Sequence, residues 1–391
     1  MLIYYRFNNF CSFNCDSEFS LIAAAGKVKS RFPDNYVKTE QGFDLLKSAV
    51  IVGENAGGKS NFIKSLRYLK SLFVLNSPVK SVSSYINTGS LQENENPIQK
   101  FELCFKARNE KIYIYQLQID KLGIVYEELQ SIKKRKSRPV TEFKVQRKED
   151  GTWESSSVLT SNRKSVVAIL ENSIGLAISK YALLNDEDAL AVVDWMTNIL
   201  YPEALLSDKV EDVRKQDEDI KILEDKRYLE IFRMVDYSIC VIDIDKEQPY
   251  SKTVIIRKDG NGNYFKRELQ KDSAGVQEFF AWAVYIFRVV YQDKVVFADE
   301  MDRVLNPILS DRVIAYINGT EHKGQFVFST HNVLHLDLKT YMKEQIYFIT
   351  KDREQLTSEL YSLADFPEVR YETTKIYEFY MKGILGGTAF E

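Results

Sequence analysis

Eight consecutive residues, Gly53–Ser60, could bind the phosphates of a nucleotide. They read GENAGGKS and fit the phosphate-loop pattern G-x-x-x-x-G-K-[ST] at every position. Glycines let successive backbone N–H groups point at phosphate oxygens, and a helix that starts here favours negative charge. Lys59 would then reach the β- and γ-phosphates of ATP, and Ser60 would place its hydroxyl on Mg²⁺. The residues expected to contact the nucleotide from this loop are Gly53, Asn55, Gly57, Gly58, Lys59, Ser60 and Asn61.

The segments on both sides of this loop have the character that the motif requires. Residues 47–52 are mostly apolar, as in a buried strand, and residues 61–72 carry apolar side chains at helical spacing. A strand, a glycine turn and a helix are therefore expected in this order, and the helix should end by residues 76–78, Asn-Ser-Pro. The alternative is a chance glycine turn before an ordinary helix, which the flanking pattern makes the weaker interpretation.

Two adjacent carboxylates follow a second apolar segment, residues 294–298. In a parallel sheet beside the phosphate loop, Asp299 would hold Mg²⁺ directly or through water, and Glu300 would face the water that attacks the γ-phosphate. Such an acidic pair is common after apolar strands and indicates little by itself. Together with a complete phosphate loop it predicts a catalytic site.

A third apolar segment, residues 324–328, runs into Ser-Thr-His-Asn at 329–332. Ligands of open α/β sheets bind at the carboxyl ends of the strands, so His331 could donate a hydrogen bond to the γ-phosphate. The alternative is a histidine that satisfies a local turn. His322 and His335 have no such placement and are expected at the surface. The predicted catalytic residues are thus Lys59, Glu300 and His331, and the predicted Mg²⁺ ligands are Ser60 and Asp299.

The overall composition is that of a soluble globular protein. With 391 residues and 45% hydrophobic content, the chain can bury a sizeable core and form two or three structural units. The net charge of −3 gives no global attraction to nucleic acid or to an anionic membrane. The N-terminus has no signal-peptide pattern, and no stretch approaches ~20 uncharged apolar residues, so a cytoplasmic protein without a membrane span is expected. Four scattered cysteines are expected to be reduced structural thiols rather than a zinc site.

Strand and helix patterns divide the chain into three parts. Residues 1–157 should form an antiparallel β lobe around the phosphate loop, with hairpins at 2–23 and 101–119 and a loop at 24–46. Residues 158–236 change to long helical stretches and are predicted as a helical insertion, whose charged run from 208 to 235 should project as an exposed helix. Residues 237–391 should complete the ATP site; they begin with strands at 238–244, 252–257 and 264–269 and an apolar helix at 275–291.

The only dense basic cluster, Lys133–Lys136 with Arg138, has two readings. It could contact a nucleic-acid backbone, or it could be a solvated hairpin tip. The acidic balance of the rest of the chain favours the tip.

With these motifs in place, the chain resembles the ABC-type ATPase class that includes SMC and RecF proteins and the double-strand-break repair ATPases. The resemblance rests on GENAGGKSN, on KDSAGVQ at 271–277, on VVFADEMD and on FSTHN. Within this class the chain is similar to the short stand-alone ATPases of bacterial phage-defence operons, such as the AbiL, PARIS and Septu ATPases and the ATPase part of OLD-family nucleases. The similarity covers about residues 1–76 and 238–391 and leaves out the predicted insertion.

This resemblance implies an α/β fold, an ABC-type P-loop ATPase with an antiparallel β lobe and a helical insertion. In relatives the ABC signature, which resembles Asp272–Gly275 here, closes over ATP held by the phosphate loop of a second subunit. Ser273 and Gly275 would then contact the nucleotide of the partner, and Asp302 would correspond to a loop that meets the partner site. His331 would be the switch histidine. ATP with Mg²⁺ would join two chains in a head-to-tail homodimer or a higher homo-oligomer. The lid glutamine of the family stays open between Gln116, Gln118 and Gln130.

Two functions follow from this resemblance. The first is a defence ATPase that senses infection and controls a separately encoded effector such as a nuclease, since the chain stops about sixty residues after His331 and leaves no room for a Toprim nuclease domain. The second is a DNA-binding repair or chromosome-maintenance ATPase, for which the basic cluster and the helical insertion are the support. A transporter subunit is disfavoured, because the hairpin-rich N-terminal half does not resemble that branch.

Overall fold

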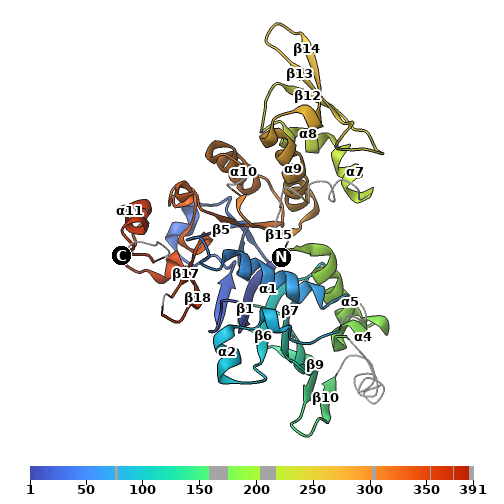
Figure 1. Ribbon diagram of the computed structural model, residues 1–391, viewed down its shortest axis with the longest axis vertical. Coiled ribbons are helices and arrows are strands. Elements are labelled where there is room, and N and C mark those ends of the chain that lie inside the picture. Colours follow the sequence, from blue (N-terminus) through green and yellow to red (C-terminus); the bar gives the residue numbers. More distant parts are fainter. Residues whose placement is uncertain are drawn as a thin grey trace.

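Two large β-sheets organise the protein in the computed structural model, which describes residues 1–74, 78–157, 175–202, 217–301, 305–352, 354–372 and 374–386 (Figure 1). The first sheet has the strand order β10-β9-β8-β7-β6-β1-β2 and is antiparallel throughout. Its strands are β1 (Leu2–Asn8), β2 (Ser17–Ser20), β6 (Gln99–Lys106), β7 (Ile112–Asp120), β8 (Gly123–Ile132), β9 (Val140–Arg147) and β10 (Trp153–Ser157).

The second sheet has the order β11-β15-β16-β5-β17-β18 and is parallel except for its last pair. Its strands are β5 (Ser48–Gly53), β11 (Leu200–Tyr201), β15 (Val295–Ala298), β16 (Gln325–Thr330), β17 (Ile346–Lys351) and β18 (Ser358–Ser362). Two smaller antiparallel sheets consist of β3 (Tyr36–Lys38) with β4 (Asp44–Leu46), and of β12 (Ile239–Asp243), β13 (Val254–Lys258) and β14 (Tyr264–Glu268).

The second sheet separates two hydrophobic cores, because its central strands are buried on both faces. In β5, for example, Ala49 and Ile51 belong to one core while Val50 and Val52 belong to the other. The first core lies between the two large sheets and includes α1 (Lys59–Ser71), α4 (Ala177–Leu183) and α5 (Glu187–Asp194). The second core includes α7 (Asp217–Leu223), α8 (Lys226–Phe232), α9 (Ala274–Gln292), α10 (Pro307–Gly319) and α11 (Ile376–Met381).

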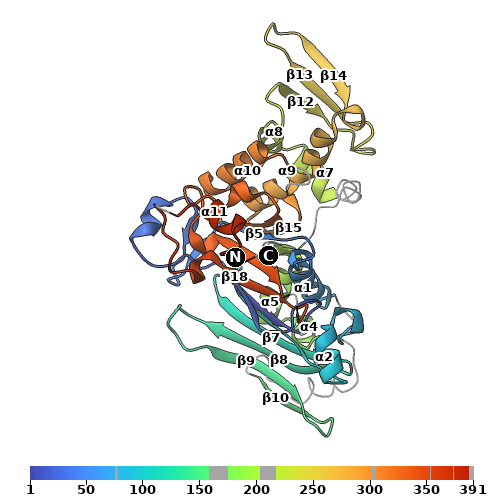
Figure 2. The ribbon, with the colours of Figure 1, turned by 60° about the vertical axis from the view of Figure 1, so that its left-hand side comes forward.

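The molecule is elongated, with the small sheet β12–β14 at one end and strands β9 and β10 at the other (Figures 1 and 2). The phosphate-loop strand β5 and helix α1 lie near the middle, between these ends. Among the described helices, none combines the length and the apolar character needed to cross a membrane.

Most predictions about individual elements are confirmed. The hairpins β1–β2, β6–β7 and β13–β14 form where the alternating patterns predict them, and α9 is buried on nearly all sides. The basic cluster is an exposed loop between β8 and β9, as predicted for a hairpin tip. The four cysteines are free thiols.

The stretch predicted as a helical insertion differs from the prediction. Its described residues do not form a unit of their own. Residues 175–199 pack against the antiparallel sheet, where Trp195 stacks on Phe105 with ring centroids 4.2 Å apart, and β11 joins the second sheet. Residues 217–235 form two short helices, and Tyr228 and Arg288 tie them to α9 through hydrogen bonds to the Phe280 carbonyl and to Asp219. The prediction of one projecting, largely exposed helix is wrong for these residues, because their apolar side chains cover α9.

Two further predictions are wrong. Residues 24–46 are not only loop, since β3 pairs with β4 there. His322 and His335 are not surface residues: His335 is 1% exposed between Phe328 and Tyr341, and His322 is 8% exposed and bonded to the Ile317 carbonyl. Burial lowers the pKa of His322, so the fold favours the neutral form of this imidazole.

Candidate nucleotide-binding site

The glycines of the phosphate loop are required by close packing. A Cβ on Gly53, the last residue of β5, would lie 2.2 Å from the carbonyl oxygen of Ile349 in β17. Gly58 has a φ of +121°, and a Cβ there would lie 2.5 Å from the Ser358 hydroxyl. Only glycine is compatible with both the approach and the backbone angle. The loop thus forms a cradle that side chains would fill.

Lys59 starts α1 and points back into this loop. The side chain is buried, and Nζ donates hydrogen bonds to the carbonyl oxygens of Gly53 at 2.8 Å and Glu54 at 2.9 Å. Ser60 and Asn55 are exposed. A triphosphate bound at this loop would therefore contact the Lys59 ammonium group and the exposed residue Ser60 in the first turn of α1.

Two serines from distant parts of the chain brace the loop. The Ser358 hydroxyl, at the start of β18, lies 2.6 Å from the Gly57 carbonyl oxygen and 2.7 Å from the Ser12 hydroxyl. The Ser12 hydroxyl in turn accepts a hydrogen bond of 2.9 Å from the Asn61 amide. Sequence reasoning missed Ser12 and Ser358, since neither stands in a motif and only the tertiary fold brings them to the loop.

The acidic pair and the histidine lie at the same sheet edge as the loop. Strand β16 lies between β15 and β5, and all three are parallel, so their carboxyl ends meet at one edge. Asp299 and Glu300 directly follow β15, and His331, which is exposed, follows β16. The fold therefore brings Lys59, Asp299, Glu300 and His331 to one edge, as predicted. Asp302 lies outside the described residues.

Ser329, the second-to-last residue of β16, orients the acidic pair. It is fully buried, its hydroxyl donates to Asp299 Oδ1, and it accepts a 2.8 Å hydrogen bond from the Glu300 backbone N–H. Glu300 has a φ of +50°, a backbone conformation that is uncommon for residues other than glycine. The sequence placed Ser329 in a polar cluster without a role, and the hydrogen bonds assign it one.

Mg²⁺ fits this edge through few protein ligands. The Ser60 hydroxyl and the Asp299 carboxylate are oxygen donors of the kind that Mg²⁺ prefers. In the part of the chain that the structure describes, no group of three or more His, Cys, Asp or Glu is arranged to hold a metal ion. A Mg²⁺ at this edge would therefore depend on these two residues together with nucleotide phosphates and water.

The signature lies on a different face of the second sheet. Ser273 is the N-cap of α9, which packs in the second core, whereas α1 packs in the first. Ser273 and Gly275 are exposed, and a Cβ on Gly275 would meet nothing within 4 Å. The structure thus does not place the signature beside the phosphate-loop helix of its own chain.

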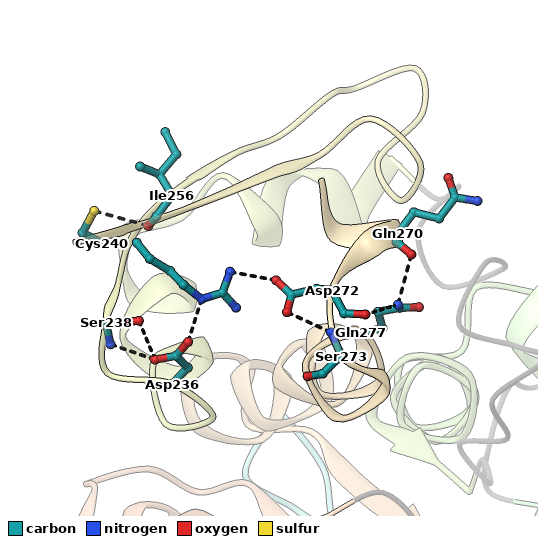
Figure 3. Close-up of polar contacts among 9 residues, drawn as sticks. Asp236, Ser238, Cys240, Ile256, Gln270, Asp272, Ser273 and Gln277 are labelled. Carbon is teal, nitrogen blue, oxygen red and sulfur yellow. Dashed lines mark hydrogen bonds and ion pairs between the residues drawn. The ribbon is translucent and has the colours of Figure 1, made fainter. Parts of the chain in front are cut away.

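An arginine holds Asp272, the first residue of the signature, in place. Asp272 accepts a 2.9 Å hydrogen bond from the Ser273 N–H and forms a 2.8 Å ion pair with Arg257, which also bonds to Asp236 at 2.7 Å. Burial lowers the pKa of Arg257, but the hydrogen bonds to the two carboxylates outweigh it and raise the pKa. Figure 3 shows Asp272, Ser273 and Gln277 gathered at the start of α9, with Asp236 opposite. Asp272 therefore ties the signature to β13.

The three glutamines considered for the lid all lie in the antiparallel sheet. Gln116 and Gln118 are on β7, and Gln130 is on β8. Gln116 donates a 2.7 Å hydrogen bond to Glu102. The structure does not single out one of them.

Comparison with known proteins identifies the fold and the family. Residues 48–337 match the family model described as "AAA domain, putative AbiEii toxin, Type IV TA system". An SMC head bound to the C-winged helix domain of ScpA is similar with a TM-score of 0.51 and 13% identity over 92% of this chain and 97% of that chain. This similarity confirms the predicted ABC-type ATPase fold.

Two further SMC heads are among the similar solved structures. The SMC head domain from Thermotoga maritima has a TM-score of 0.48 and 13% identity over 92% of this chain and 98% of that chain. The Smc head domain with an extended coiled coil, bound to the C-terminal domain of ScpA and derived from Pyrococcus furiosus, has a TM-score of 0.46 and 13% identity over 98% of each chain. No curated protein matches the chain.

Proposed function

We propose that this chain, which belongs to the family of AAA domains described by reference to the AbiEii toxin, binds ATP with Mg²⁺ and hydrolyses it in a site that a second copy completes. The observation that supports this proposal best is the convergence at one sheet edge. Phosphate loop, acidic pair and histidine come from three neighbouring parallel strands, and Ser329 holds the acidic pair in place. Catalysis would then rest on positioning and charge, as phosphoryl transfer requires.

Each chain would supply most of one site. The glycine cradle and the first N–H groups of α1 receive the phosphates, and Lys59 exchanges its loop carbonyl partners for phosphate oxygens. Ser60 and Asp299 would hold Mg²⁺, and the bound ion would supply positive charge beside the phosphates. Glu300, fixed through its backbone N–H, orients and deprotonates the attacking water, and His331 donates a hydrogen bond to the γ-phosphate.

A second copy would supply the rest. The exposed Ser273 and the open space before Gly275 lie at the start of a 19-residue helix, whose N-terminus favours anions. Since α9 and α1 cover opposite faces of the sheet, a head-to-tail two-fold dimer would place each signature against the ATP of the other chain. ATP would thus control subunit contact.

The biological role that we propose is control of a separately encoded effector, such as a nuclease, in bacterial anti-phage defence. The family description names a toxin–antitoxin system, and the motifs resemble those of stand-alone defence ATPases. Dimerisation around ATP would be the signal that restrains or activates the effector.

The mechanism is tested with two variants. Lys59→Ala should abolish ATP binding, because the phosphates lose their buried cation. Glu300→Gln should keep ATP binding, stop hydrolysis and trap an ATP-bound dimer. Equilibrium ATP binding, phosphate release and sedimentation velocity measure the three properties. A Glu300→Gln chain that hydrolyses ATP at the parental rate would remove Glu300 from the role of the base.

The effector role is tested by identifying proteins that co-purify with the Glu300→Gln chain from cells, and a purified chain that cleaves DNA alone in Mg²⁺ would contradict this division of labour. Duplex DNA binding is the competing outcome, since Lys133–Lys136 are exposed. Binding that weakens steeply with salt, and further when these four residues become Ala, would support a DNA-maintenance ATPase instead.

A further inference from the structure

The start of α9 opens onto a depression that the small sheet β12–β14 borders. Ser273 and Gly275 line it from α9, residues 265–267 line it from β14, and Asn306 lines it from the residue before α10. The space in front of Gly275 is open, because a Cβ there would meet no atom within 4 Å. The signature therefore shares its depression with β14, a strand that carries none of the motifs.

The part of the depression between Arg267 and the start of α9 favours an anion. Two carboxylates border the depression, Asp236 and Asp272, and Arg257 binds both of them. Arg267 forms no ion pair within the described part of the chain. The N-terminus of α9 adds backbone N–H donors and the positive end of the helix dipole, and the hydroxyl of Ser273 does not cap the helix. The formal charges of Asp236 and Asp272 balance those of Arg257 and Arg267, and Arg257 pairs with both carboxylates. Arg267 and the N-terminus of α9 are therefore the groups in the depression that an anion would meet.

The pairing of β13 with β14 decides which side chains face the depression. Arg267 pairs with Ile255, which is fully buried in the second core, and Phe265 pairs with Arg257, so these side chains share the inner face. Lys266 pairs with Ile256, and its side chain leaves the opposite face of the strand although the residue borders the depression. Phe265 is 58% exposed, a large aromatic surface without a cover.

We propose that the β13–β14 hairpin is a second element that acts on the ATP of the partner chain, with Arg267 binding phosphate oxygens and Phe265 packing against the partner subunit. The inference rests on the proposed composite site and extends it from the signature to β14. The occupant of the depression is the triphosphate held by the phosphate loop of a second copy, whose negative charge matches the cation and the helix N-terminus. Arg257 fixes the hairpin to Asp272, so the signature and Arg267 approach the nucleotide together.

The test compares Arg267→Ala with Lys266→Ala, each added to the Glu300→Gln chain. The two substitutions remove one cation from adjacent positions of an exposed strand, on opposite faces. Arg267→Ala should raise the ATP concentration needed for half-maximal dimerisation about tenfold or more, as for the loss of a hydrogen bond to a charged group. Lys266→Ala should change it less than about twofold. Sedimentation velocity measures dimerisation, and circular dichroism checks the fold.

Mixing two variants tests whether Arg267 acts on the partner. Lys59→Ala removes the phosphate loop of one chain, and Arg267→Ala removes the hairpin cation of the other, so a mixed dimer keeps one intact site. The ATPase rate of the mixture should exceed the sum of the separate rates, whereas action within one chain predicts no gain.

Three results would overturn the inference. Equal ATP requirements for the Arg267→Ala and Lys266→Ala chains would refute the role of Arg267 and leave the composite site standing. A mixture without gain would place Arg267 within its own chain. A Glu300→Gln chain that stays monomeric at saturating ATP would refute the composite site itself, and the inference with it.

Discussion

Glu127 fastens α4 to the antiparallel sheet and should make the stability of the protein depend on pH. It is fully buried on β8 and accepts hydrogen bonds from the backbone N–H groups of Ala177 at 2.7 Å and Ile178 at 2.9 Å, and from the Tyr115 hydroxyl at 3.0 Å. Burial raises the pKa of Glu127 from 4.5 to about 7, and the three hydrogen bonds, with the charge of Lys180, oppose it only in part.

The sign of the effect follows from the direction of this change. Because the pKa is higher in the folded chain, folding favours the protonated carboxyl, and its contribution to stability is fully present below about pH 4.5 and is lost as the pH rises through 7. At about 1.36 kcal/mol per pKa unit, the free energy of unfolding should fall by about 3 kcal/mol from this group.

The perturbation is Glu127→Gln, which cannot ionise. The amide NH₂ of the glutamine would face the Ala177 N–H, so that two hydrogen-bond donors oppose each other. This unmade hydrogen bond should lower the free energy of unfolding by about 1–3 kcal/mol at every pH. This constant loss cancels when each protein is compared with itself at two pH values. Between pH 4.5 and pH 8, the parent should lose about 3 kcal/mol more than the variant.

Urea unfolding followed by tryptophan fluorescence at both pH values measures these changes. Glu128→Gln, the neighbouring residue whose side chain leaves the other face of β8, controls for the loss of one carboxylate from the strand. If Glu127→Gln and the parent lose the same free energy of unfolding between the two pH values, the argument from burial is refuted.

Two further predictions concern the nucleotide site. Ser329→Ala should lower kcat for ATP hydrolysis about tenfold or more with little change in KM, because Asp299 and Glu300 lose the hydroxyl that positions them. A kcat equal to that of the parent chain would show that the acidic pair does not need Ser329. Gly53→Ala should weaken ATP binding strongly and lower the free energy of unfolding by about 1–3 kcal/mol or more, because the new Cβ would lie 2.2 Å from the Ile349 carbonyl oxygen. Calorimetry measures the ATP affinity. An unchanged affinity would show that the loop does not depend on the close approach of Gly53 to Ile349.

The order strand, glycine loop, helix around Lys59 could be predicted because it depends on residues that are neighbours in the chain. The same holds for the polar residues after β15 and β16, since a short apolar strand followed by Asp-Glu or by Ser-Thr-His is a local pattern. Hairpins such as β13–β14 can also be predicted from local sequence, because apolar and polar residues alternate in the strands and an Asp-Gly-Asn-Gly turn joins them. These features led to the fold and to the edge of the sheet where the predicted site lies.

The remaining features depend on contacts between distant parts of the chain, and no local pattern encodes them. Ser358 reaches the phosphate loop across 301 residues, and Glu127 meets the start of α4 across 50. The sequence pattern predicted helix for residues 217–235, but it could not show that their apolar side chains pack against α9. The predicted exposed helix was therefore wrong.

By itself the sequence determined which chemical groups the chain carries and which strand or helix ends present them, because backbone propensity and motif spacing act over a few residues. Only the tertiary structure decided that β16 lies between β15 and β5, that Ser329 bonds to both members of the acidic pair, and that the signature and α1 occupy opposite faces of one sheet. Strand order and face are consequences of how whole layers bury their apolar surfaces, and that is a property of the complete fold.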